Sequence, residues 1–236
     1  MINNRLICRA ARYLRRGGFT LVELLVVIGI IAILAGVALG PITRGIKQAQ
    51  ENATLQVSHQ IGILEFAYSN DYNQVYPTAT GGTGNNIADA LLNGGYTSTP
   101  SLFYVANTPL AAKYTGATAP YAMSAATHTV NWDFMYNKTG TTGLTSASSD
   151  ATPLVQLTGG TAPTMATTFA SPGATLTLTT SSTAFGADGV AVYYKGNNAK
   201  FLKGVSTGAT SATVAAWIDT TFNDPNGASY GLTTPF

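Results

Sequence analysis

A long apolar run near the N-terminus dominates the pattern of the sequence. Between Phe19 and Gly40 the only charged residue is Glu23, and apolar side chains fall on every side of a helix drawn through the segment. A helix that is apolar all round is typical of a membrane span or of an element buried in a large assembly. The run is also long enough to cross a bilayer core about 30 Å thick. It therefore predicts a transmembrane helix at residues 19–40.

From Pro41 onward the apolar positions fall on one side of a helix. Their three- and four-residue spacing predicts an amphipathic helix at residues 41–76. We expect its apolar stripe to pack mainly against the rest of this chain, and the flank nearest Pro41 to pack on neighbouring copies. Because proline removes a backbone donor and glycine weakens a helix, we also expect a kink or an unwound segment near Gly36–Gly45. The stripe consists of Ile42, Ile46, Ala49, Ala53, Val57, Ile61, Leu64 and Tyr68.

Residues 77–236 have the composition of a β-rich domain, since they are rich in Thr, Ser, Gly and Ala and poor in charge. A short helix is expected at Ile87–Asn93, where Gly94 and Gly95 end it. The chain as a whole predicts an α+β fold, in which a long N-terminal α-helical spine packs on a β-rich C-terminal head domain. The helix would occupy residues 19–76 and the head residues 77–236.

Runs of β-branched and aromatic residues predict the strands of the head. The clearest pair is Val190–Lys195 and Ala199–Lys203, which Gly196–Asn198 would join as a hairpin. The other predicted strands are Val130–Tyr136, Leu154–Thr158, Thr175–Thr180 and Thr213–Ile218.

The segment before the apolar helix has a different charge from the rest. Residues 1–18 contain five arginines and no acidic residue, whereas the seven Lys/Arg and ten Asp/Glu of residues 19–236 give a net charge of −3. A basic segment ahead of an apolar helix holds the N-terminus in the cytoplasm. An uncleaved signal anchor would have the same features. A conventional secretory signal fits less well, because the apolar run is too long and no small-residue cleavage site follows it.

Glu23 needs an explanation, because a carboxylate in a membrane-length helix is costly. A cut between Gly18 and Phe19 would expose an α-amino group that is largely cationic near neutral pH. Phe19 and Glu23 are four residues apart and so share one helix face. The new amine could neutralise Glu23 within its own chain, or Glu23 of one copy could pair with Phe19 of the next. Only the second arrangement specifies the stagger between copies.

The residues around this cut carry a resemblance to a known family. Gly18, Phe19, Thr20, Leu21 and Glu23 resemble the class III signal of bacterial type IV pilins and type II secretion pseudopilins, over residues 15 to about 77. The resemblance implies that a prepilin peptidase removes the leader, residues 1–18, and methylates Phe19. It implies a single-pass precursor in the inner membrane, which an assembly platform and its motor extract into a homo-oligomeric helical filament, either extracellular or periplasmic.

Several other classes of protein are disfavoured. Cys8 is the only cysteine and lies in the leader, so the mature chain could form no disulfide. No basic stripe supports direct nucleic-acid binding. We find no catalytic or phosphate-binding motif, and His59 and His128 are isolated, so we expect no enzymatic activity and no organic cofactor.

Calcium is the one metal that the sequence suggests. The segment Asp219–Gly227 concentrates oxygen ligands in a turn-rich loop, and hard cations need six to eight oxygens. Asp219, Asp224 and Asn226 would supply the side-chain ligands. Ordinary turn chemistry also accounts for these residues.

The sequence therefore leads to a structural subunit of a type IV pilus-like filament. Two alternatives stay open. One is a type II secretion pseudopilin, which the missing disulfide favours. The other is a membrane- or filament-displayed adhesin or glycan-binding head, which the twelve tyrosines favour.

Overall fold

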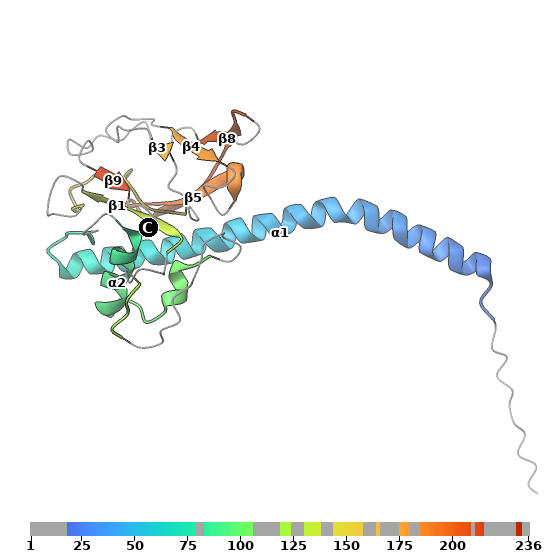
Figure 1. Ribbon diagram of the computed structural model, residues 1–236, viewed down its shortest axis with the longest axis horizontal. Coiled ribbons are helices and arrows are strands. Elements are labelled where there is room, and N and C mark those ends of the chain that lie inside the picture. The colour runs from blue at the N-terminus through green and yellow to red at the C-terminus, as the bar shows by residue number, and fades with distance from the viewer. Residues whose placement is uncertain are drawn as a thin grey trace, which may run out of the picture. The chain divides into compact units, whose positions relative to one another are not determined.

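The structure is a computed structural model, and the residues it describes are 18–78, 83–105, 119–123, 130–137, 144–157, 164–165, 175–179, 185–208, 211–214 and 230–232. The chain divides into two units, residues 1–48 and residues 49–236. The long N-terminal helix α1, Leu21–Asp71, runs from the first unit into the second. Antiparallel sheets make up much of the second unit, so the chain has the predicted α+β architecture (Figure 1).

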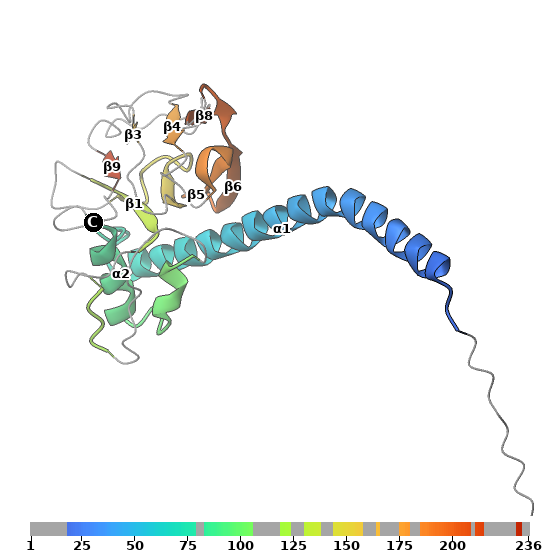
Figure 2. The same cartoon turned by 45° about the vertical axis from the view of Figure 1, so that its right-hand side comes forward.

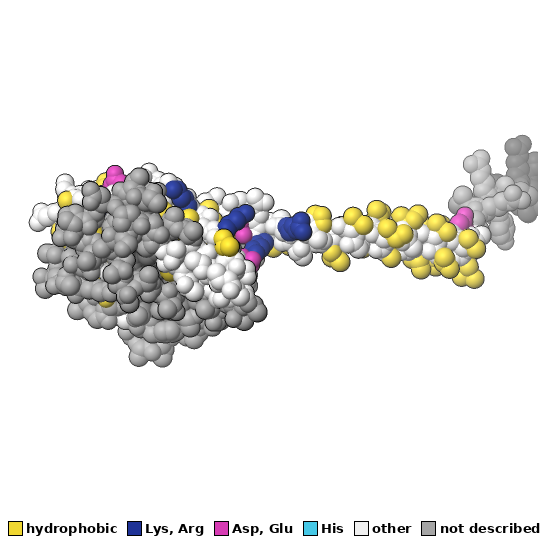
Figure 3. Space-filling model, turned by 90° about the horizontal axis from the view of Figure 1, so that it is seen from above, with side chains coloured by type: hydrophobic (Ala, Val, Ile, Leu, Met, Phe, Trp, Pro, Cys, Tyr) yellow, Lys and Arg dark blue, Asp and Glu magenta, His cyan; other side chains and the backbone are white. Residues whose placement is uncertain are grey.

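In the first unit, α1 is an exposed apolar helix. Its most apolar window has a mean hydropathy of 2.8, and none of that window is buried, so α1 is long and apolar enough to cross a membrane. Figure 3 shows hydrophobic side chains gathered along this part of the helix. The exposed large hydrophobic side chains between Leu21 and Ile46 are all Leu, Val or Ile.

Of the kink or unwound segment expected near Gly36–Gly45, the unwound segment is absent, because α1 stays helical through Pro41. Figure 2 shows that the helix bends along its course. Two residues after Pro41, the Thr43 hydroxyl donates to the carbonyl oxygens of Leu39 and Gly40 at 3.2 and 2.9 Å. A threonine hydroxyl commonly bonds back to the preceding turn of a helix in this way.

In the second unit, a five-stranded antiparallel sheet has the strand order β6-β5-β2-β1-β9. The hairpin predicted from the sequence is confirmed: β5 and β6 pair from Gly189↔Lys203 to Tyr194↔Asn198, and Asn197 in the turn has a φ of 59°. The strands of this sheet are β1 Trp132–Asn137, β2 Pro153–Leu157, β5 Gly189–Tyr194, β6 Asn198–Lys203 and β9 Tyr230–Leu232.

A second, four-stranded sheet has the order β3-β4-β8-β7. Its central strands β4 and β8 lie within or overlap the predicted strands, whereas β3, β7 and β9 were not predicted. Each of these three has only two or three residues in the structure, which is too short for a periodic pattern. The strands are β3 Thr164–Met165, β4 Leu176–Thr179, β7 Val205–Ser206 and β8 Ser211–Val214, and the 3-10 helix η2, Gly186–Asp188, precedes β5.

The short helix α2, Gly84–Asn93, packs against β1 and the 3-10 helix η1, Pro100–Phe103. It begins three residues before the predicted start and ends where expected. Gly95, two residues after Asn93, has a φ of 79° and takes the left-handed conformation that glycine accepts without strain.

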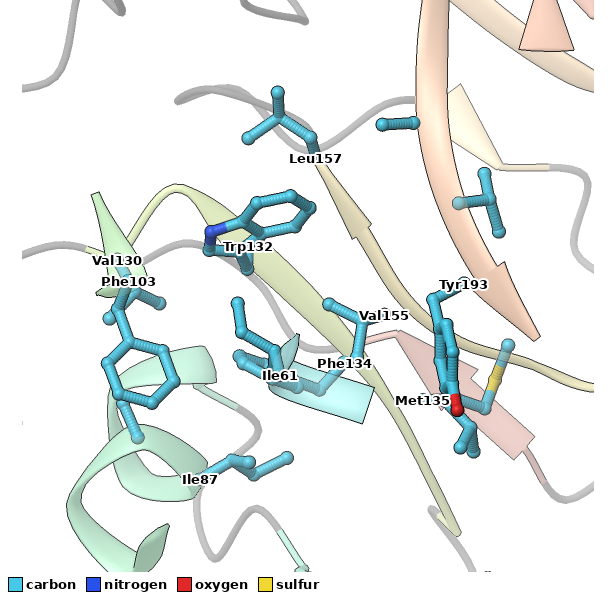
Figure 4. Close-up of a cluster of buried hydrophobic side chains, with 14 of the residues drawn as sticks. Ile61, Ile87, Phe103, Val130, Trp132, Phe134, Met135, Val155, Leu157 and Tyr193 are labelled. Carbon is cyan, nitrogen blue, oxygen red and sulfur yellow. The ribbon is translucent and has the colours of Figure 1, made fainter. Parts of the chain in front are cut away.

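The C-terminal part of α1 packs on one face of the five-stranded sheet. Cross-strand pairing places Phe134, Val155 and Tyr193 in one row across β1, β2 and β5. Figure 4 shows these side chains beside Ile61 of α1 and Trp132. Ile61, Phe134 and Val155 are fully buried, so this contact is the centre of the hydrophobic core.

The buried line of α1 differs from the predicted apolar stripe, and this prediction was wrong in part. Ile61 is fully buried, and Val57, Leu64 and Tyr68 are partly buried, but Ala49 and Ala53 are exposed. Most residues in the buried line have small side chains, which let the aromatic face of the sheet approach the helix closely. The line consists of Thr54, Ser58, Ile61, Gly62, Glu65 and Ser69.

Gly62 is the point of closest approach. A Cβ at this position would overlap the ring of Tyr193, which is 3% exposed and also meets His59 edge-on at 5.6 Å between ring centroids. Because Tyr193 is held on several sides, it cannot move away cheaply.

Glu65 lies in the same buried line, and it is 2% exposed. Its Oε2 is buried without a hydrogen-bond partner. Burial raises the pKa of the Glu65 carboxyl well above 4.5. Two tyrosines lie close enough to feel its charge: burial and then Glu65 raise the pKa of Tyr76 to about 12, and the same two causes raise the pKa of Tyr193. The carboxyl is therefore an unfavourable group in the core whenever it is ionised.

We predict that Gly62→Ala destabilises the protein by about 1–3 kcal/mol, since overpacking outweighs the better helix propensity of alanine. The control is Gly45→Ala, where an added Cβ meets nothing within 4 Å and helix propensity should give a small gain. Denaturant unfolding of the full chain in detergent micelles measures both changes. Equal free energies of unfolding for the two variants would contradict the close approach at Gly62.

We predict that Glu65→Gln stabilises the protein at neutral pH and has little effect in acid. The raised pKa means that folded Glu65 keeps its proton at pH values where the unfolded chain has released it. Wild-type stability should therefore fall as pH rises from 4.5 through the raised pKa, and the neutral amide should remove this fall. Melting temperatures of the full chain in micelles at about pH 4 and about pH 8 test this. Glu51→Gln on the same helix is the control, and the idea fails if the two variants respond to pH alike.

Candidate functional site

The start of α1 holds the residues that the sequence analysis singled out. Gly18 and Phe19 precede the helix, and both are exposed, Phe19 to 78%. Thr20 is the last residue before Leu21 begins α1, and Glu23 lies in the first turn. The peptide bond between Gly18 and Phe19 is therefore outside the helix and open to a protease.

Thr20 and Glu23 form a reciprocal cap. The backbone N–H and the hydroxyl of Thr20 donate to Glu23 Oε2 at 2.8 and 2.7 Å, and the backbone N–H of Glu23 donates to the Thr20 hydroxyl oxygen at 3.2 Å. This arrangement is a capping box, in which two residues three apart satisfy each other's free backbone donors. A carboxylate in the first turn is also stabilised by the positive end of the helix dipole.

The capping box shows that Glu23 also stabilises the start of α1, in addition to the charge pairing with Phe19 that the sequence suggested. In the uncut chain, hydrogen bonds from Thr20 satisfy one oxygen of the carboxylate. Phe19 lies outside α1, so the full chain does not place Phe19 and Glu23 on one helix face. The sequence analysis missed the role of Thr20, although the Thr-x-x-Glu pattern of a capping box is present in the sequence.

The calcium ligands expected at Asp219, Asp224 and Asn226 lie outside the described residues, as does His128. His59 is partly buried and contacts the Tyr193 ring. Among the residues that the structure describes, no group of three or more His, Cys, Asp or Glu side chains could hold a metal ion. The start of α1 is therefore the candidate site for which the described residues give the most detail.

Residues 14–39 match the family model described as the prokaryotic N-terminal methylation motif. The matched segment contains the Gly18–Phe19 bond, the capping box and the apolar first part of α1. It does not extend into the head. No curated protein and no solved structure matches the chain.

We predict that Thr20→Ala frays the first turn of α1. Loss of a threonine cap typically costs about 1 kcal/mol, so exchange of the Glu23 and Leu24 amides, which donate to Thr20, should become about fivefold faster. Hydrogen exchange of the full chain in micelles measures this, and Thr43→Ala is the control because its hydroxyl bonds back to mid-helix carbonyls instead of capping an end. Unchanged exchange at Glu23 and Leu24 would show that the capping box does not stabilise the helix start.

Proposed function

The chain carries the prokaryotic N-terminal methylation motif, the signature of type IV pilins and pseudopilins, and from this premise we propose that it is a structural subunit of a type IV pilus-like filament. A prepilin peptidase cuts after Gly18 and methylates Phe19. The observation that carries the proposal is the motif itself, which includes the start of an exposed apolar helix that is long enough to span a membrane.

The apolar first part of α1 needs two environments in succession. Its side chains are exposed in the single chain, so a membrane covers them in the precursor. In a filament, the same helices of neighbouring copies would cover one another. Burial from water is worth about 25 cal/mol per Å² of apolar surface, but lipid already provides most of that gain. Moving the helix from membrane to filament therefore requires an external motor, which fits a partnership with an inner-membrane assembly platform.

Glu23 changes its partner during this sequence of events. Before the cut, Thr20 supplies hydrogen bonds but no positive charge. The cut creates an amine on Phe19, which is largely cationic near neutral pH. In a filament, Glu23 of one copy pairs with the Phe19 amine of the next, and this pairing determines the stagger between copies. Until the Phe19 amine of a neighbouring copy pairs with Glu23, the capping box holds the Glu23 carboxylate at the start of the helix.

A type II secretion pseudopilin is the second candidate. The observation that favours it is the single cysteine, Cys8, which leaves the mature chain without a disulfide. The two candidates share the processing and the helix packing. They differ in where the assembled subunit accumulates, because a surface pilus can be sheared from cells.

We predict that Glu23→Ala leaves processing intact and abolishes filament assembly. Glu23→Gln is the matched variant, because glutamine keeps the hydrogen bonds of a capping box but lacks the charge. If charge pairing drives assembly, both variants should fail. The measurement is mass spectrometry of the N-terminal peptide in the sheared and membrane fractions of cells that contain the assembly machinery.

The outcomes of this experiment are distinct. Methylated Phe19 in sheared wild-type material supports a pilus subunit, and methylated Phe19 confined to the membrane supports a pseudopilin. An intact leader in both fractions would overturn the proposal. Normal filaments from Glu23→Gln would show that the cap and not the charge is needed.

A further inference from the structure

Three tyrosines gather at the C-terminal end of α1. Tyr68 and Tyr72 stack almost parallel, with ring centroids 4.1 Å apart and an interplanar angle of 8°. Tyr96, which follows α2, packs against Tyr68 with ring centroids 5.5 Å apart. The Tyr96 hydroxyl donates to Asp71 Oδ2 at 2.7 Å, which ties the segment after α2 to the end of α1. We call Tyr68, Tyr72, Tyr96 and Asp71 the tyrosine ledge.

The backbone around the ledge is held in place. Tyr96 lies against Gly94, where a Cβ would come within 2.7 Å of the ring, and its N–H donates to the Leu91 carbonyl at 3.1 Å. Beyond Tyr72 the chain turns through Asn73 and Gln74, which have positive φ values of 52° and 62°. Non-glycine residues adopt this conformation at a cost, which the surrounding contacts must offset. The N–H of Gln74 donates to the Ser69 carbonyl at 2.6 Å, so the turn is pinned to α1.

Tyr72 is the exposed tyrosine of the ledge. It is 51% exposed, whereas Tyr76 and Tyr193 in the core are 4% and 3% exposed. One face of its ring stacks on Tyr68, and about half of the residue is open to solvent. The ring of Tyr72 is not among the buried residues of the core. It offers a flat, preorganised surface for a ligand.

An open groove adjoins the ledge and adds hydrogen-bonding groups. It is lined by Gln60, Ile63, Leu64, Thr97, Thr99 and Leu102. Leu64 is one helical turn before Tyr68, and Thr97 follows Tyr96 directly, so the groove and the ledge are neighbours on both sides. None of these lining residues is charged. The groove therefore combines an apolar floor with one amide and two hydroxyl groups.

This chemistry selects one class of ligand. The electron-rich face of an aromatic ring attracts polarised C–H groups, which line the flat faces of sugar rings. Amide and hydroxyl side chains can donate to and accept from sugar hydroxyls. Polyanions are disfavoured because no lining residue is cationic and Asp71 carries a negative charge. We propose that the tyrosine ledge and its groove bind a neutral saccharide chain, with a sugar ring stacked on Tyr72.

The test uses the purified full chain in micelles of a zwitterionic detergent, since sugar-headed detergents would compete. The probe is an array of neutral and acidic oligosaccharides, followed by calorimetry with any neutral hit. We expect binding to a neutral oligosaccharide, and Tyr72→Ala should weaken it by about tenfold or more. Tyr72→Phe keeps the ring and should retain most of the affinity. Val205→Ala, at a side chain 66% exposed on β7, is the control and should bind as wild type does.

Three results would overturn the proposal: no binding of wild type to neutral oligosaccharides, binding to acidic ones alone, or neutral binding that Tyr72→Ala leaves unchanged. Melting temperatures of all variants separate loss of the ring from loss of the fold. Because the experiment uses isolated protein, its failure would leave the filament proposal standing, and failed assembly would leave this one standing.

Discussion

The close approach between α1 and the aromatic face of the five-stranded sheet is the contact on which the head depends. Gly62 makes it possible, because any larger residue would overlap the Tyr193 ring. Ile61 then reaches the row formed by Phe134, Val155 and Tyr193, and the core closes around it. A helix with large apolar residues along the same line would be held further from the sheet and would leave those rings partly exposed.

This contact also imposes a cost. Glu65 belongs to the same line of α1, and the fold buries its carboxyl beside Tyr76 and Tyr193. Small polar residues in the line, such as Ser58 and Ser69, avoid a similar cost because their hydroxyls donate to carbonyls of their own helix. The fold therefore combines close packing along this line of α1 with one buried carboxyl that is unfavourable when ionised. Proteins of marginal stability commonly combine favourable and unfavourable contacts in this way.

At its N-terminal end, α1 meets a different constraint. The first part of the helix is apolar enough to lie in a membrane, yet its first turn contains Glu23. The capping box lowers the cost of a carboxylate at this position, because Thr20 supplies hydrogen bonds from the same chain. It does not neutralise the charge. Our proposed function gives the remaining charge its partner in the processed amine of a neighbouring copy. The same helix thus contacts its own head through small residues at one end and would contact other copies through large apolar ones at the other.

The sequence by itself determined the parts of this protein that depend on local pattern. It was enough to predict the long helix, the end of α2 before Gly94 and the β5–β6 hairpin, because periodicity and turn residues act over a few neighbours. The capping box was also readable, from Thr20 and Glu23 at three-residue spacing. Tertiary structure alone decided that Gly62 and Glu65, and not Ala49 and Ala53, face the sheet, since that choice depends on the shape of Tyr193, more than a hundred residues away. It also decided that Tyr96 joins Tyr68 and Tyr72, because the Gly94–Gly95 turn brings together segments that share no local pattern.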